Sequence, residues 1–207
     1  MIALDEKNGM EEMVGLPEPS DASCRRARQS LDATLRPLRS YCGWVDGPMG
    51  RLYVARTDKG LCRISFKERE DDFLYELECC GSIPELDAQR VDPIRRQLDE
   101  YFGGKRRRFR LALDPVFVSE FQASVLGSAR RIPFGATVSY SDIARDIGKP
   151  RASRAVGNAL GKNPVAIVIP CHRVVPADGS LGGYTGGTHI KKLLMEIEGI
   201  QFKGAAS

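Results

Sequence analysis

The chain is organised around one stretch, Val165-Ala166-Ile167-Val168-Ile169-Pro170-Cys171-His172-Arg173-Val174. Its apolar first half has the pattern of a short buried strand, so we predict a strand over 165–169. Cys171 would then lie where a rigid element ends and a loop begins, a position where residues that carry chemistry are often held. A thiol becomes a nucleophile as the thiolate, and the neighbouring His172 offers a base for its proton. A buried structural cysteine is the alternative interpretation of Cys171.

A helix-turn-helix pattern precedes this stretch. Ser139 or Ser141 can cap a short first helix, and a second helix, rich in small residues, is predicted over 152–160. Three polar residues fall on one face of the second helix: Arg151, Arg154 and Asn158. Small side chains let a helix backbone approach its partner closely, and arginines supply contacts to phosphate or to stacked bases. Tight packing of this helix in a core is the alternative interpretation.

The segment after Cys171 contains Gly182-Gly183-Tyr184-Thr185-Gly186-Gly187, which predicts a loop whose backbone comes very near a ligand. A final helix is predicted over 188–198. Glu198 falls in its last turn, where the helix dipole disfavours a carboxylate. Such a local misfit is often tolerated for function. Position alone favours an exposed glutamate.

The N-terminal part of the chain is polar over its first 40 residues, which predicts a loose, partly flexible extension with one short helix over 25–38. A first domain then starts near Tyr41, with a hairpin of two strands around the turn residues Asp58-Lys59-Gly60. Asp92-Pro93 opens a helix that ends at Gly103-Gly104. The basic cluster Lys105–Arg110 is interpreted as a solvated strand edge, with contact to nucleic acid as the alternative.

The fold class is therefore α+β. We expect an extension over 1–40, a small α/β domain with an antiparallel sheet over 41–114, a mainly helical domain over 115–203 that contains the helix-turn-helix and the buried cysteine, and a tail over 204–207. Ser119 and Gln122 form a capping box for the first helix of the second domain.

Charge is unevenly distributed along the 207 residues. The net charge is +4, but residues 130–175 carry 8 Lys and Arg against 2 Asp and Glu. This positive field suits a surface that docks on phosphate, with a solvated basic face as the alternative. No apolar run approaches the ~20 residues that span a bilayer, and the first residues are not a signal peptide. We therefore expect a cytoplasmic protein, nuclear in a nucleated cell, with reduced cysteines and no membrane contact.

Four motifs occur in order: Arg154-Ala155-Val156-Gly157, Asn163-Pro164, Pro170-Cys171-His172-Arg173-Val174, and Tyr184 with Gly186-Gly187. In these motifs the chain resembles the O6-alkylguanine-DNA alkyltransferase family, closely over about 119–199 and more faintly back to Tyr41. The resemblance implies a suicide DNA repair protein, a methylated-DNA–protein-cysteine methyltransferase that acts once on O6-alkylguanine and also on O4-alkylthymine. The sequence sets neither the range of alkyl groups nor the preference between the two bases.

The resemblance also implies a role for each matching residue of the reactive centre. Cys171 would accept the alkyl group, His172 would act through a water as its base, Glu198 would hold that histidine, and Asn163 would brace the turn before the nucleophile. Lys191 would steady the site from the helix that carries Glu198.

A second set of roles concerns the DNA. Tyr140 would push the 3′ phosphate of the target nucleotide and Arg154 would fill its place in the stack, because a duplex hides the O6 atom until the base is flipped out. Tyr184 would line the pocket and protonate the leaving base, and the Thr185 N–H would bond O6. The remaining residues implied at the DNA or the lesion are Ser141, Arg151, Gly157, Arg173 and Val174.

The implied partner is double-stranded DNA, bound through the minor groove by a monomer that needs no cofactor. We expect no metal, because both histidines fall after residue 170 and the cysteine spacing does not suit a tetrahedral zinc site. A DNA-damage binding protein or regulator without transfer is one alternative function. A cysteine hydrolase built on Cys171 and His172 is another, although it would need a stabilised oxyanion and a way to release its product.

Overall fold

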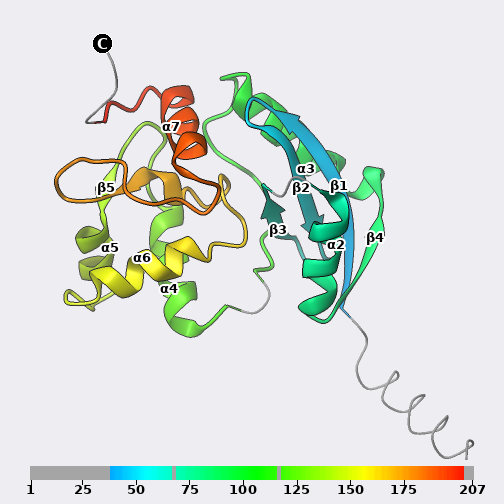
Figure 1. The fold of residues 1–207 in the computed structure, drawn as a ribbon, viewed down its shortest axis with the longest axis horizontal. Coiled ribbons are helices and arrows are strands. Elements are labelled where there is room, and N and C mark those ends of the chain that lie inside the picture. Colours follow the sequence, from blue (N-terminus) through cyan, green and yellow to red (C-terminus); the bar gives the residue numbers. More distant parts are fainter. Residues whose placement is uncertain (1–37, 67–68, 116–117, 203–207) are drawn as a thin grey trace, which may run out of the picture. The chain divides into compact units, whose positions relative to one another are not determined.

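The structure is a computed structural model that describes residues 38–66, 69–115 and 118–202, all within one compact unit (Figure 1). The helix predicted over 25–38 lies outside the described residues except for Leu38, as does the predicted 204–207 tail. In chain order the elements are β1 (Leu38–Gly47), β2 (Gly50–Arg56), β3 (Leu61–Ser65), α2 (Glu70–Cys79), β4 (Ser82–Leu86), α3 (Ala88–Phe102), α4 (Glu120–Arg130), β5 (Val138–Ser139), α5 (Tyr140–Asp146), α6 (Ser153–Gly161), the 3₁₀ turn η1 (Cys171–Arg173), β6 (Val174–Val175) and α7 (Thr188–Ile197). The α+β prediction is confirmed.

The N-terminal sheet has the strand order β3-β2-β1-β4. The predicted hairpin is confirmed: β2 and β3 pair antiparallel, and the turn between them closes with Thr57 N–H donating to Gly60 O at 2.8 Å. β1 also pairs antiparallel with β2, whereas the outer strand β4 lies parallel to β1. Gly60 has no room for a side chain, because a Cβ there would lie 2.5 Å from the Ala112 carbonyl oxygen.

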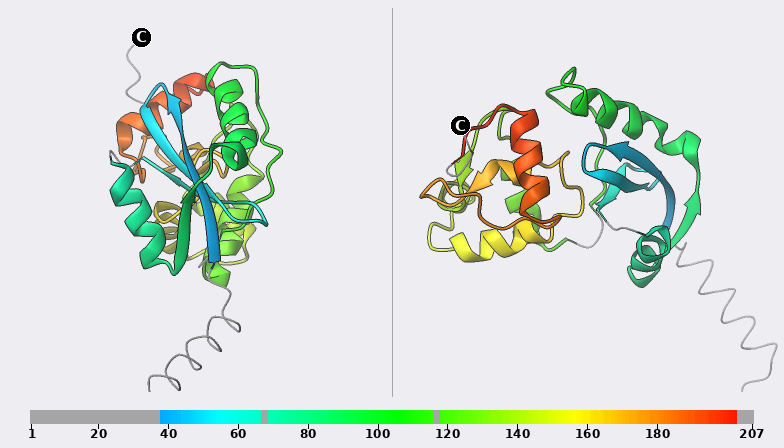
Figure 2. Two further views of the ribbon diagram at one scale, coloured as in Figure 1. Left: turned by 90° about the vertical axis from the view of Figure 1, so that its right-hand side faces the viewer. Right: turned by 45° about the horizontal axis from the view of Figure 1, so that its top comes forward.

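Helix α3 packs against β1 and β2 and buries Val91, Ile94 and Leu98 toward the sheet (Figure 2). The prediction that Asp92-Pro93 opens this helix is wrong. The helix begins at Ala88, because the Asp87 side chain caps it by accepting a hydrogen bond from Arg90 N–H at 3.0 Å. The proline is carried inside the helix between two buried apolar residues. The predicted end is confirmed, with Gly103 as the C-cap.

The basic cluster Lys105–Arg110 is not a strand edge, so that interpretation is wrong. The segment has no regular secondary structure, and its backbone forms hydrogen bonds with α3 instead of with a strand. Lys105 and Arg106 N–H both donate to Glu100 O, at 2.8 and 3.1 Å. At the far end, Arg110 N–H donates to Gln97 Oε1 at 2.7 Å. Because α3 accepts hydrogen bonds from these backbone N–H groups, they do not need a neighbouring strand as a partner.

The C-terminal part is mainly helical, as predicted, and α5 and α6 form the predicted helix-turn-helix. Ser139 rather than Ser141 caps α5, in a reciprocal capping box with Asp142. Ser119 caps α4 as predicted, but Gln122 does not complete the box, because its side chain donates to the Ala159 and Lys162 carbonyls of the α6 end. One apolar core runs from the sheet (Leu52, Val54) through α3 (Leu98) to α4 and α7 (Val125, Leu194).

The strand predicted over 165–169 is wrong. The segment consists of turns with one isolated bridge between Ala166 and Ile169, and Ile167 takes a φ of 73°. Every residue of the run is buried, and a short apolar run does not distinguish a strand from a buried turn. No helix in the described ranges is long and apolar enough to cross a membrane.

Candidate active site

Cys171 opens the 3₁₀ turn η1, and Asn163 holds the chain that leads to it. The Asn163 side chain accepts a hydrogen bond from Val165 N–H at 3.1 Å and donates one to Ile169 O at 2.9 Å. The same amide nitrogen lies 3.2 Å from Cys171 Sγ and donates to it. One buried side chain therefore closes the turn at both ends and contacts the nucleophile, which explains how Ile167 is kept at positive φ.

The thiol of Cys171 is buried and protonated in the resting protein. Burial raises the pKa of Cys171, while the hydrogen bond from Asn163 and the positive charge of Lys191 lower it. Lys191 is itself fully buried on α7 and donates from Nζ to Val174 O at 2.7 Å. Burial lowers the pKa of Lys191 to about 8, so it still carries its charge at neutral pH.

Glu198, at the C-cap of α7, is buried and accepts five hydrogen bonds, so the expectation of an exposed glutamate is wrong. The donors, with their distances, are Tyr101 OH (2.7 Å), His172 Nε2 (2.8 Å) and Arg173 Nη2 (2.9 Å) to Oε1, and Arg173 Nε (2.8 Å) and Gly135 N (3.1 Å) to Oε2. Burial opposes ionisation of this carboxyl, but the bonds from His172 and Arg173 outweigh it and lower the pKa of Glu198 to about 2.

His172 is held neutral with one ring nitrogen free. Burial lowers its pKa, and the bond to Glu198 only partly offsets that effect. A carboxylate can only accept, so the proton is on Nε2 and Nδ1 carries a lone pair. Nδ1 is buried and has no hydrogen-bond partner among the described residues. The arrangement is a neutral base beside Cys171, oriented by a carboxylate whose own charge is matched by Arg173.

A pocket of about 370 Å³ opens onto Cys171. Its lining includes four further residues that the sequence placed at the DNA or the lesion: Tyr140, Gly157, Tyr184 and Thr185. The volume is in the range of small-molecule sites, roughly 300–1,000 Å³. The Tyr184 hydroxyl is buried without a hydrogen-bond partner in the described part of the chain. Burial, followed by the adjacent Cys171, raises the pKa of Tyr184 well above its usual value, so it stays a proton donor.

The pocket wall depends on close contacts of small residues. Gly157 on α6 faces the Tyr140 ring, where a Cβ would make an ordinary van der Waals contact at 3.7 Å, whereas the space at Gly182 is tighter. Gly182 has a φ of +64°, and a Cβ there would lie 2.9 Å from Pro176 and 3.4 Å from the Tyr140 hydroxyl. Thr185 Oγ1 donates to Gly161 O at 2.8 Å and ties the loop to the end of α6.

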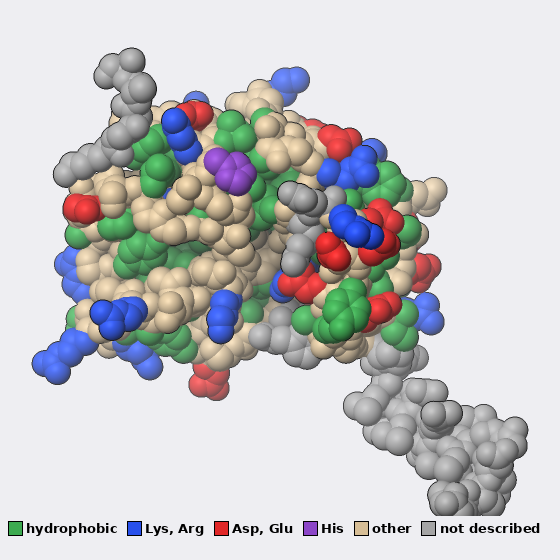
Figure 3. Space-filling view, viewed as in Figure 1, with side chains coloured by type: hydrophobic (Ala, Val, Ile, Leu, Met, Phe, Trp, Pro, Cys, Tyr) green, Lys and Arg blue, Asp and Glu red, His purple; other side chains and the backbone are tan. Residues whose placement is uncertain are grey.

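The remaining predicted residues divide into an exposed and a buried set. Arg151 and Arg154 are exposed at the start of α6, and Figure 3 shows Lys and Arg side chains gathered at the lower left, where Figure 1 draws α5 and α6. Ser141 is half-buried at the start of α5, and its hydroxyl forms a hydrogen bond with the Ser139 hydroxyl at 2.7 Å. Arg173, Val174 and Lys191 are buried, unlike the exposed Arg151 and Arg154.

Two members of the site carry no functional signal in the sequence. Tyr101, on α3 of the N-terminal part, and the Gly135 backbone both bond Glu198. Tyr101 gave only the signal of a core aromatic at helical spacing, and its ring does pack with Phe109 and Phe134. The Gly135 N–H gave no signal in the sequence.

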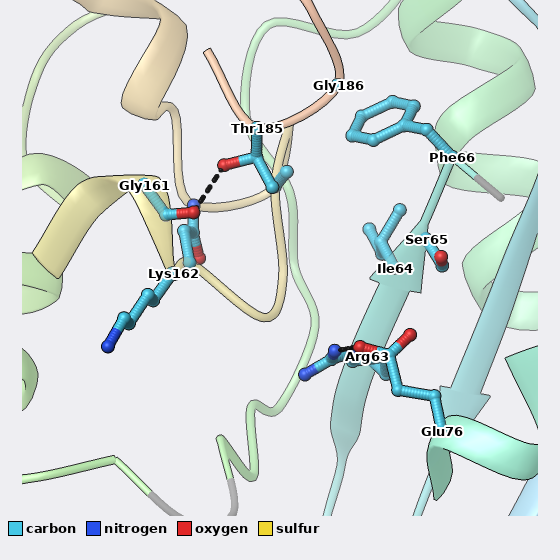
Figure 4. A pocket seen from close by; sticks show the side chains of 11 residues that line it. Arg63, Ile64, Ser65, Phe66, Glu76, Gly161, Lys162, Thr185 and Gly186 are labelled. Carbon is cyan, nitrogen blue, oxygen red and sulfur yellow. Dashed lines mark hydrogen bonds and ion pairs between the residues drawn. The ribbon is translucent and has the colours of Figure 1, made fainter. Parts of the chain in front are cut away.

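A second cavity, of about 530 Å³, lies between β3 and the end of α6 (Figure 4). Arg63 and Glu76 form an ion pair at one side of it, and the Thr185–Gly161 hydrogen bond lies at the other. Gly161 and Thr185 also line the Cys171 pocket, so they separate the two spaces. The described lining of the larger cavity contains no cysteine, whereas the smaller one contains Cys171, and we therefore assign the site to the smaller one. Within the described ranges, no three His, Cys, Asp or Glu side chains converge as metal ligands.

Together these features define a class of protein: a buried thiol with a histidine–carboxylate pair, set at the floor of a pocket beside a helix-turn-helix. Comparison with models of known protein families supports this class. Residues 40–115 match the ribonuclease-like domain of 6-O-methylguanine DNA methyltransferase, and residues 120–200 match its DNA binding domain. The chain belongs to the 6-O-methylguanine DNA methyltransferase family, which confirms the resemblance.

Individual relatives give the same result. The inducible methylated-DNA–protein-cysteine methyltransferase of Bacillus subtilis is 41% identical over 71% of this chain and 83% of its own length. The Mycobacterium bovis enzyme of the same name is 48% identical over 74% of this chain and 89% of its own. A crystal structure of Mycobacterium tuberculosis OGT in complex with DNA superposes with a TM-score of 0.66 at 37% identity, covering 76% of this chain and 92% of that one.

Proposed function

We propose that the protein is a single-turnover DNA repair protein that transfers the alkyl group of O6-alkylguanine, and of O4-alkylthymine, to Cys171. The observation that carries the proposal is the Cys171 thiol at the floor of a pocket, next to a neutral His172 whose Nε2–H is committed to Glu198. The free Nδ1 is then available to take the thiol proton through a water.

The proposed transfer forms one S–C bond and breaks one C–O bond. Cys171 Sγ attacks the alkyl carbon, the new S–C bond forms and the C–O6 bond breaks with its electron pair going to the base. The Tyr184 hydroxyl donates a proton to the leaving guanine while the Thr185 N–H bonds O6, and the thiol proton held by His172 then passes through water to re-protonate Tyr184. Overall the thiol proton replaces the alkyl group on guanine. A thioether has no route back, which makes the protein stoichiometric.

Asn163 and Glu198 support this step without contacting the base. The Asn163 amide donates to Sγ and stabilises the thiolate more than the thiol, since hydrogen bonds to charged groups are the stronger ones. Glu198 stabilises the imidazolium that forms when His172 takes the proton. Arg173 forms an ion pair with Glu198 and keeps it ionised. Through this pair the buried Arg173 supports the proton transfer to His172.

The pocket requires a flipped nucleotide, because the buried thiol cannot reach a base inside a duplex. In the proposal a monomer binds double-stranded DNA in the cytoplasm, with α6 in the minor groove and Arg151 and Ser141 near the phosphates. Tyr140 pushes the 3′ phosphate of the target nucleotide outward and Arg154 fills the gap. The glycine and alanine content of α6, with Gly157 directly against Tyr140, suits the narrow groove.

The test is the intact mass of the protein after incubation with a duplex that contains O6-methylguanine. We expect a permanent gain of one CH₂ unit, mapped to the peptide with Cys171, and none in Cys171→Ala. Cys62→Ala is the matched control, because Cys62 is also buried and burial raises its pKa to about 12. No gain in the wild type would favour a binding protein without transfer, and a transient adduct would favour a hydrolase.

A further inference from the structure

A third cavity, with a strong positive charge, lies beside the Cys171 turn. Its volume is about 340 Å³, and five arginines line it: Arg107, Arg108, Arg130, Arg131 and Arg173. No Asp or Glu belongs to its lining, and it shares no lining residue with the Cys171 pocket. We call this cavity the arginine groove.

Among the described residues, three of the five guanidiniums have no counter-charge in an ion pair. Arg131 is paired with Asp146, and Arg173 with Glu198. Arg107, Arg108 and Arg130 are exposed and form no ion pair in the described parts of the chain. Like charges that converge on one groove repel each other, and a bound anion removes that repulsion.

The wall that carries Arg107 and Arg108 is fixed in place. Arg106 donates from Nε to Glu100 Oε2 at 2.7 Å and from Nη1 to Arg108 O at 2.8 Å. Gln97 holds the other end, where it exchanges hydrogen bonds with the Arg110 backbone at 2.7 and 3.2 Å. Because α3 anchors the segment on both sides, little backbone freedom is lost when an anion binds.

We propose that the arginine groove binds the phosphate backbone of DNA outside the nucleotide that enters the Cys171 pocket. The proposal rests on the proposed function, which brings the protein onto DNA. Guanidinium groups match phosphate geometry, and the two rings in the described lining, Phe109 and Phe134, both already pack against Tyr101. The Phe134 ring has the Arg107 guanidinium 5.5 Å and the Arg173 guanidinium 5.8 Å from its centroid. The contact therefore adds affinity without reading sequence.

The choice of DNA over an acidic protein follows from the groups that the groove exposes. Protein interfaces depend on buried aromatic or aliphatic anchors at their centre. Here every exposed residue of the described lining except Pro133 is an arginine, from the segment after α3 or from the end of α4. Each phosphate contact releases counterions, so salt dependence is the specific signature of this mode of binding.

The experiment compares two double variants of the full chain with equal loss of charge. Arg108→Gln with Arg130→Gln removes one guanidinium from each wall. Arg95→Gln with Arg96→Gln removes two from the exposed face of α3, where both pair with Asp92. Affinity for a long, undamaged duplex is measured against salt. Loss of two phosphate contacts should reduce the slope of log affinity against log salt by about 1.8 in the groove variant. The slope of the α3 variant should stay at the wild-type value.

Equal slopes for the two variants would overturn the proposal, because the groove would then act only through net charge. Binding of polyglutamate that is lost in the groove variant, with an unchanged DNA slope, would also overturn it and indicate an acidic protein partner. Alkyl transfer to Cys171 is followed by mass in parallel. If the wild type transfers normally but the slopes coincide, the groove proposal alone fails. If the wild type gains no mass, the proposed function fails.

Discussion

Replacing Glu198 by Gln should destabilise the protein in a way that depends on pH. The amide keeps the size of the side chain but removes the charge that faces Arg173 and His172. The pKa of this carboxyl is lowered from an ordinary 4.5 to about 2 in the folded protein. At ~1.4 kcal/mol for each pKa unit, the ionised form contributes about 3 kcal/mol to the free energy of unfolding at neutral pH.

The direction of the pH dependence follows from the lowered pKa. The contribution is complete above the unfolded-state value of 4.5 and is lost as the pH falls toward about 2. The assay is urea denaturation of wild type and Glu198→Gln from pH 7 to the lowest pH at which both fold. The difference between them should be about 3 kcal/mol at pH 7 and should shrink steadily below pH 4.5.

The matched control is Glu196→Gln, two residues away. Glu196 is exposed and lies 4.0 Å from Lys192, a surface pair whose loss should change stability by less than about 0.5 kcal/mol. A difference between wild type and Glu198→Gln that stays constant from pH 7 down to pH 3 would refute the reasoning. It would mean that shape, and not the charge on Glu198, stabilises the site.

Three further changes test separate parts of the account. Tyr101→Phe keeps the ring contacts but removes one donor to Glu198, so it should slow alkyl transfer and cost roughly 1.5–3 kcal/mol of stability. Tyr41→Phe is the control and should leave the transfer rate unchanged. Equal transfer rates for Tyr101→Phe and the wild type would show that Tyr101 acts only in packing. Asn163→Ala removes the hydrogen bond to Cys171 Sγ and should raise the thiol pKa, measured by the pH dependence of its alkylation; an unchanged pKa contradicts the assignment. Arg154→Ala should reduce repair of duplex DNA about tenfold or more, because stacking is worth roughly 1–3 kcal/mol per base. Equal losses of repair on duplex and single-stranded DNA would show that Arg154 does not fill the place of the flipped base in the stack.

The sequence predicted the elements whose ends carry their own chemical signals. Ser139 with Asp142 caps α5, and Gly103 ends α3, because a side-chain cap or a glycine acts locally. The start of α3 shows the limit of such signals. Both Asp87 and Asp92 can cap a helix, and only the packing of Val91 and Ile94 against the sheet decides between them.

The reactive cysteine was identifiable from its neighbours, but the backbone that presents it was not. Residues 165–169 have the composition of a strand, yet Asn163 closes them into turns through two hydrogen bonds, with Val165 N–H and with Ile169 O. Tyr101 was missed for a different reason. It lies 97 residues from Glu198 in the chain, and a tyrosine on the buried face of a helix looks the same whether or not its hydroxyl has a functional partner.

The central claim is that Cys171 loses its proton to a His172 that Glu198 holds in place, and single-turnover transfer against pH tests it most directly. Below its pKa a free thiol gains thiolate about tenfold per pH unit. We predict that the wild-type rate changes little around neutral pH. The Glu198→Gln rate should be much lower at pH 7 and should rise with pH, as solution base supplies the thiolate that His172 no longer generates. Coincident profiles for the two proteins would contradict the claim.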